Sequence, residues 1–259
     1  MELWPSLYIS HGSPMHAIEN TAAAASWRAL AAELGKPRAI LMVSAHWETN
    51  VPMLTSGAEL PTIHDFGGFP EALYRIQYPA PGAPALAERV QTLLREADTC
   101  SGLDARRGLD HGAWVPLLHM YPDADVPVLQ LSVQSDRGAR HLLAVGRALQ
   151  TLRSEGVLII GSGSMTHNLR DFFTQRLPGN GNYAEEFRDW VDARLIAGRV
   201  DELLDWETQA PHALRAHPSP EHFLPLFAAL GAAGEPYQAR NTFRGFDGGV
   251  LAMDVYRFD

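Results

Sequence analysis

The chain has 259 residues, of which 46% are hydrophobic and 20% charged, and its formal net charge is −9 at pH 7. This balance is typical of a globular protein, so residues 1–259 are expected to form a single domain. The acidic charge disfavours nucleic acid and anionic membrane surfaces as partners, because both select for clustered Lys and Arg. A single cysteine, Cys100, and the lack of a signal-like or membrane-length apolar run make the cytoplasm the expected compartment.

Short apolar runs alternate with longer amphipathic stretches along the chain. Such alternation, with strands that read as continuous apolar runs, is typical of a sheet covered on both faces. We therefore predict an α/β fold: a central, mostly parallel or mixed sheet flanked by helices on both faces. In chain order, the predicted elements are strand 7–10, helix 20–35 with Asn20 as its cap, strand 39–45, helix 83–98, strand 126–133, helix 138–156, strand 157–164, helix 183–198, helix 219–231 capped by Ser219, and strand 248–258.

Several of these elements lead into a histidine. His11 and His46 follow the first two strands, and His167 follows the fourth through the turn "GSGSMT". Ligands of open α/β sheets bind beyond the carboxyl ends of the strands, so these side chains are expected at one edge. His222, predicted in the first turn of helix 219–231, could join them. Neutral imidazole is the commonest protein ligand for Zn, Fe and Cu, so the pattern indicates a metal site built from separate elements.

The remaining histidines carry less information. The chain contains no HExxH or CxxC motif that would mark a local metal site. An isolated histidine is usually a surface residue or a hydrogen-bonded core residue, and this interpretation applies to four of them: His16, His119, His141 and His212.

Six motifs, read together, resemble a known family. They are "SHGSPM", "SAHWET", "DFGGFP", "LDHGAWVPL", "GSGSMTHN" and "PEHFLPL", and they span residues 10–226 in order. As a set they resemble the class III extradiol ring-cleavage dioxygenases of the LigB-like superfamily, and within it the 4,5-DOPA dioxygenase extradiol branch. The resemblance implies a cytoplasmic enzyme that opens a catechol-type substrate with O₂ at a non-haem metal, with DOPA and 4,5-cleavage as candidates. It implies Fe(II) for activity, with Zn(II) able to occupy the same site.

The resemblance also assigns roles to residues. It makes His11, His46 and His222 the metal ligands. His167 matches the acid/base of the active site, although some descriptions of the family count it as an additional ligand. His111, in the "DHG" motif, matches a second catalytic, substrate-facing histidine. Three neutral histidines leave a metal its full charge and several open positions, and a histidine near its reference pKa of about 6.5 can take up and return a proton.

The substrate pocket is expected to have apolar walls around this centre. The residues expected to border the substrate are His64, Asp65, Trp47 and Phe66. An amino-acid substrate also needs a cation for its carboxylate, and the candidates are Arg75, Arg240 and Arg244.

Two other functions fit the same histidines. One is a zinc-dependent hydrolase, since zinc with three histidines and an open position activates water. The other is a non-catalytic metal-binding relative. The presence of both His167 and His111 beside the expected ligands favours an enzyme. The sequence specifies neither the catechol nor the oligomeric state.

Overall fold

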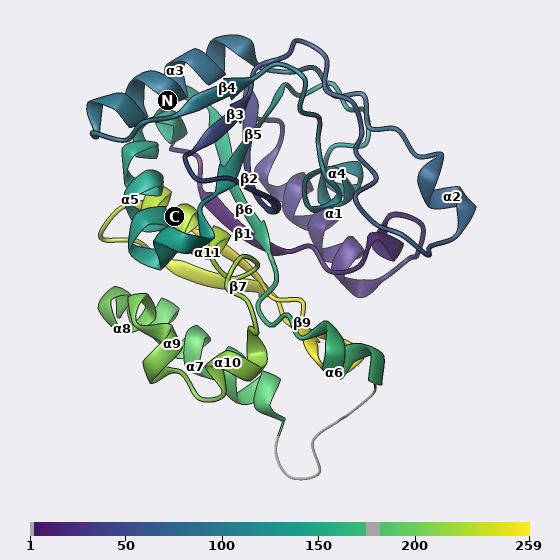
Figure 1. The fold of residues 1–259 in the computed structure, drawn as a ribbon, viewed down its shortest axis with the longest axis vertical. Helices are drawn as coiled ribbons and strands as arrows, with labels where there is room; N and C mark the ends of the chain where they lie inside the picture. The colour runs from purple at the N-terminus through teal and green to yellow at the C-terminus, as the bar shows by residue number, and fades with distance from the viewer. Residues whose placement is uncertain (1–2, 175–181) are drawn as a thin grey trace.

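The structure is a computed structural model, and it describes residues 3–174 and 182–259. An eight-stranded sheet runs through its centre in the order β4-β3-β5-β2-β6-β1-β10-β7 (Figure 1). The strands of this sheet are β1 (Ser6–Ser10), β2 (Ala39–Glu48), β3 (Met53–Thr55), β4 (Gly102–Asp104), β5 (Val128–Val133), β6 (Val157–Gly163), β7 (Ala239–Phe243) and β10 (Val255–Phe258). A separate two-stranded hairpin contains β8 (Phe246–Asp247) and β9 (Leu251–Ala252).

The sheet is mixed, with a parallel interior. Strands β5, β2, β6 and β1 are parallel neighbours, whereas β10 joins β1, and β7 joins β10, in antiparallel pairs. Every residue of β1, β5 and β6 is buried, which explains their continuous apolar sequences. The α/β fold predicted from the sequence is therefore confirmed.

Helices cover both faces of the sheet. One core packs α3, α5, α7 and α11 against it, and a second core on the other face contains α1 and α4. The helices are α1 (Ala22–Leu34), α2 (Glu71–Tyr74), α3 (Pro84–Glu96), α4 (His111–Met120), α5 (Gly138–Ala148), α6 (Leu169–Thr174), α7 (Tyr183–Ile196), α8 (Val200–Leu204), α9 (Trp206–Gln209), α10 (Ala213–Ala216) and α11 (Pro225–Ala233). Within the described ranges, none of these helices has the length and apolar character needed to cross a membrane.

Several predicted boundaries are wrong for identifiable reasons. Thr21, not Asn20, caps α1, because its hydroxyl accepts a hydrogen bond from the Ala24 N–H. The predicted helix 138–156 ends at Ala148 and continues as a separate 3₁₀ turn, and the predicted strand 248–258 divides into β9 and β10. The last helix begins at Pro225 rather than Ser219. A proline ring clashes with the carbonyl four residues earlier and lacks an N–H, so Pro225 disfavours a helix that continues back to Ser219.

Candidate metal centre and its cavity

His11 lies where β1 leaves the sheet, and a serine on the neighbouring strand fixes its ring. The His11 N–H donates to the carbonyl of Gly163, and His11 Nδ1 lies 2.9 Å from Ser162 Oγ. Ser162 donates its hydroxyl proton to the Gly112 carbonyl over 2.5 Å. Because a hydroxyl has one proton, Ser162 must accept the Nδ1–H of His11. This tautomer leaves the Nε2 lone pair of His11 free to bind a cation.

His46 lies on the part of β2 that extends beyond the end of β6. Its Nδ1 is 3.4 Å from Asp65 Oδ2, and the other oxygen of Asp65 accepts both the N–H and the Nδ1–H of His111, at 2.9 and 3.0 Å. Burial raises the pKa of Asp65, but its hydrogen bonds from His111 outweigh burial and lower that pKa to about 2. Asp65 is therefore an ionised carboxylate that orients His46 and His111 together.

His222 lies in the turn before α11, not in the helix itself as predicted. Its carbonyl accepts the Ser164 N–H at 2.8 Å and the Tyr8 hydroxyl at 3.2 Å. The turn packs so closely on β6 that a Cβ on Gly163 would lie 2.0 Å from the His222 oxygen, so only glycine fits there. His222 Nδ1 is 2.8 Å from the Glu221 carboxylate, which leaves its Nε2 as the free nitrogen.

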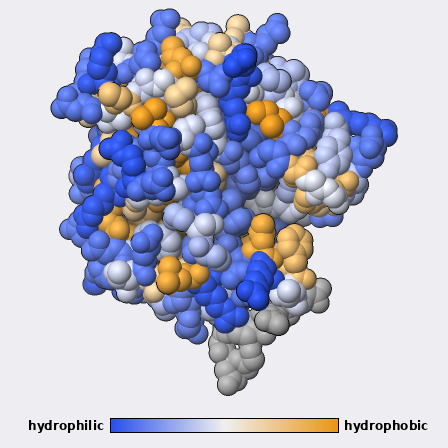
Figure 2. All heavy atoms as spheres, in the orientation of Figure 1, coloured by the Kyte–Doolittle hydropathy of each residue, from blue (hydrophilic) through white to orange (hydrophobic). Residues whose placement is uncertain are grey.

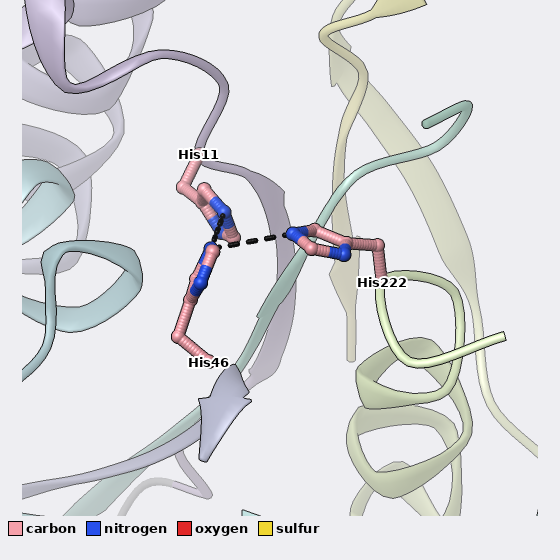
Figure 3. A group of neighbouring side chains, drawn as sticks. All are labelled: His11, His46 and His222. Carbon is pink, nitrogen blue, oxygen red and sulfur yellow. Dashed lines mark hydrogen bonds between the residues drawn. The ribbon is translucent and has the colours of Figure 1, made fainter. Parts of the chain in front are cut away.

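The free nitrogens of these three histidines converge on one point (Figure 3). His46 Nε2 lies 3.0 Å from His11 Nε2 and 3.2 Å from His222 Nε2. The partners of the Nδ1 atoms direct three lone pairs at one another, an arrangement that a bound cation would stabilise. Imidazole nitrogens bind Zn²⁺ at about 2.0–2.1 Å. Two nitrogens bound to such a metal are therefore about 3.0 Å apart if they bind at 90°, as in an octahedron, and about 3.4 Å apart if they bind at the tetrahedral angle. The two observed spacings lie between about 3.0 and 3.4 Å, so the three nitrogens could bind one metal and leave it open positions for other molecules.

Burial keeps this centre uncharged in the absence of a metal. It lowers the pKa of His11 and His222 well below the ordinary histidine value, and neighbouring imidazoles lower both further. Burial, together with the neighbouring His111, also lowers the pKa of His46 to about 3. The three side chains are therefore neutral at pH 7, as metal ligands must be.

His167 and His111 lie directly beside the centre. The His167 ring stacks on that of His222, with centroids 3.4 Å apart and planes 11° from parallel. The His111 ring centroid is 3.9 Å from that of His46. Burial lowers the pKa of His167 to about 4, so the expectation of a pKa near 6.5 is wrong for the metal-free site. His167 is neutral at pH 7 and can accept a proton, but it returns that proton readily.

A buried carboxylate that sequence reasoning missed links the strands to α4. Asp110 caps α4 through the Ala113 N–H and accepts the Ser44 hydroxyl at 2.7 Å. The Arg107 guanidinium donates to Asp110 and, over 3.2 Å, to the carbonyl of His46. Asp110 thereby fixes His111 and the end of β2 relative to each other. An Asp directly before a helix-opening sequence is a cap signal, although the contacts with β2 connect residues distant in the sequence.

A cavity of about 700 Å³ opens beside the histidines. Phe66, Phe69, Phe172 and Phe173 line it, and its size and aromatic walls suit a small aromatic ligand. Figure 2 shows hydrophobic side chains gathered over α6, where Phe173 is largely exposed. Asp65 also lines the cavity, and its contact with a substrate stays a prediction.

Two residues expected to border the substrate lie elsewhere. His64 lies outside the cavity lining, and its Nε2 is 3.0 Å from the Ile76 carbonyl. Trp47 is buried and also lies outside the lining, with the guanidinium of Arg107 5.1 Å from its ring centroid. None of the three arginines considered for a substrate carboxylate lines the cavity, and each pairs with an acidic residue: Arg75 with Glu71, Arg240 with Glu33, and Arg244 with Asp189.

Comparison with known proteins identifies the family. Residues 4–249 match the family described as the catalytic LigB subunit of aromatic ring-opening dioxygenase. The chain is 45% identical over 267 aligned positions to "4,5-DOPA dioxygenase extradiol" of Beta vulgaris, with 98% of this chain and 96% of that protein covered. It is 41% identical to the protein of the same name from Escherichia coli K12, with 96% and 92% covered.

A solved structure agrees with this match. The crystal structure of the uncharacterized protein JW3007 from Escherichia coli K12 superposes with a TM-score of 0.79 at 34% identity, covering 98% of this chain and 99% of that one. The chain belongs to the LigB family of aromatic ring-opening dioxygenases.

Proposed function

We propose that the protein is an extradiol dioxygenase that opens a catechol-type ring with O₂ at a non-haem metal. The observation that carries this proposal is the convergence of His11, His46 and His222 through Nε2 atoms 3.0 and 3.2 Å apart, at the wall of an aromatic cavity. Their spacing fits a metal that keeps several positions open, and extradiol cleavage needs open positions for two catechol oxygens and for O₂. Fe(II) is the proposed metal for activity, and Zn(II) is expected to fit the same nitrogens. The metal would bind and polarise the catechol and supply the redox chemistry.

The protein's own side chains would position the ring and move its protons. Phe66 and Phe69 provide an apolar wall against which a flat ring can pack. His167 is neutral at pH 7 and lines the cavity beside His222, so it can accept a proton from a catechol hydroxyl and later return it. His111 is held by Asp65 on the other side of His46 and would donate or accept a hydrogen bond at the substrate.

DOPA, cleaved between its 4 and 5 positions, is the candidate substrate within this class. The names of the relatives from Beta vulgaris and Escherichia coli support it, as does coverage of nearly the whole chain. We place this activity in the cytoplasm because the chain has a single cysteine, Cys100, as a reducing compartment favours.

Oxygen consumption tests the proposal. Protein loaded anaerobically with Fe(II) is mixed with DOPA or 4-methylcatechol in an oxygen electrode, and the yellow ring-opened product is followed by absorbance. One O₂ should be consumed for each catechol, and the metal-free protein should consume none. Anaerobic turnover with Zn(II) would instead indicate a hydrolase.

A further inference from the structure

A carboxylate on the cavity wall has one oxygen held by a buried histidine. Asp247, on the β8–β9 hairpin, accepts a hydrogen bond from His16 Nε2 over 2.7 Å through Oδ2. His16 is only 3% exposed, and its Nδ1 is 2.8 Å from the hydroxyl of Thr21. His16, Thr21 and Asp247 all line the cavity. Within residues 3–174 and 182–259, Asp247 Oδ1 has no hydrogen-bond partner, so it remains available to a ligand.

This pair lies next to the candidate metal centre. Gly12 follows His11 directly, and a Cβ on Gly12 would lie 2.7 Å from His16 Nε2. His16 Nε2, which holds the Asp247 carboxylate, thus lies against the residue that directly follows a proposed metal ligand in the chain. A catechol ring seated at the three histidines would therefore have its ring substituent within reach of this part of the wall.

Among the described residues that line the cavity, the charged side chains other than histidine are all acidic. They are Glu19, Asp65 and Asp247, and no Lys or Arg from the described ranges joins them. Asp65 already contacts His46 and His111, whereas the Asp247 side chain lines the cavity and is 29% exposed. A ring substituent that carries a positive charge would be attracted to this wall, and one that carries only a carboxylate would be repelled.

We infer that Asp247 receives the ammonium group of the substrate side chain, and that the preferred substrates are catechols with an aminoethyl-type side chain. The inference rests on the proposed function and narrows it. The ammonium would donate a hydrogen bond to the free oxygen of Asp247, while His16 keeps the other oxygen in place. A carboxylate on the side chain, as in DOPA, would then be dispensable, and dopamine would be accepted at least as well.

The test compares catechols that share the ring to be opened and differ in the charge of the ring substituent. With Fe(II)-loaded protein, kcat/KM is measured for dopamine, DOPA, 3-(3,4-dihydroxyphenyl)propionate and uncharged 4-methylcatechol. Dopamine should exceed the propionate by about tenfold or more. Asp247→Asn should lower kcat/KM for dopamine by about tenfold or more, leave 4-methylcatechol within about threefold, and improve the propionate. Glu88→Gln, which removes an exposed charge on α3 away from the cavity, should change none of these values.

Calorimetric titration of the same catechols under argon gives a readout independent of turnover. Asp247→Asn should weaken the binding of dopamine and leave that of 4-methylcatechol unchanged. Equal losses for charged and uncharged catechols, or a wild type that prefers the propionate, would overturn the inference while leaving the dioxygenase intact. If no catechol were turned over by the wild type, the proposed function would fail, and this inference with it.

Discussion

Replacing Ser162 by alanine should weaken metal binding without touching a proposed ligand. Ser162 accepts the Nδ1–H of His11 at 2.9 Å and donates to the Gly112 carbonyl at 2.5 Å, and it is fully buried. Without it, the proton on the His11 ring has no fixed position, and its free nitrogen is no longer directed at the centre. Loss of such a supporting contact typically lowers metal affinity by about 10–100-fold. The unsatisfied groups left behind should also cost about 1–3 kcal/mol in the free energy of unfolding.

Ser6→Ala is the matched control for this change. Ser6 is also a fully buried serine on a central strand, and it donates to the Ala229 carbonyl at 2.7 Å, but it contacts no histidine of the centre. Both variants should lose similar stability in thermal unfolding of the metal-free protein. Only Ser162→Ala should release metal more readily in competition with a chelator. Equal metal affinities for Ser162→Ala and the wild type would refute the proposed control of the His11 tautomer.

The remaining predictions concern the acid/base, the space between the rings and pH. His167→Ala should keep its metal, because the proposed ligands remain, and lose turnover by about 10²–10⁴-fold; a metal-free preparation would instead identify His167 as a ligand. Gly112→Ala should reduce metal content, since its Cβ would lie 2.6 Å from Ser44 Oγ and 3.0 Å from the His46 ring. The His46 pKa of about 3 lies below the unfolded value of about 6.5, so the unfolded chain binds more protons between these values. Stability of the metal-free protein should therefore fall as pH is lowered from about 6.5 towards 4, and a melting temperature constant over this range would contradict the neutral cluster.

The parts of the site that sequence could predict are those set by local pattern. Continuous apolar runs mark β1 and β2, so the convergence of His11 and His46 at one edge follows from the parallel order of the sheet. Trp47 lies outside the lining of the cavity for a simple reason. The strand β2 extends to Glu48, and successive side chains of a strand point to opposite faces, so His46 and Trp47 cannot both face the same cavity.

Other features depend on contacts that no local pattern reports. In the sequence, Ser162 is one of several small residues in the "GSGS" stretch. Its contact with His11 follows from the position of β6 beside β1 in the sheet, which the sequence pattern does not report. Likewise, Ser219 and Pro220 resemble a helix start and predict a helix around His222, whereas the helix begins at Pro225. The pairing of His16 with Asp247 joins residues 231 positions apart.

Isotopic labelling of oxygen tests the central claim most directly. Fe(II)-loaded protein is allowed to react with a catechol under isotopically labelled O₂ in ordinary water, and the product is analysed by mass spectrometry. We expect a ring-opened product whose new carboxylate carries an oxygen atom derived from O₂. A product whose added oxygen comes only from water, or turnover that continues without O₂, would contradict the assignment of His11, His46 and His222 to a ring-cleaving dioxygenase centre.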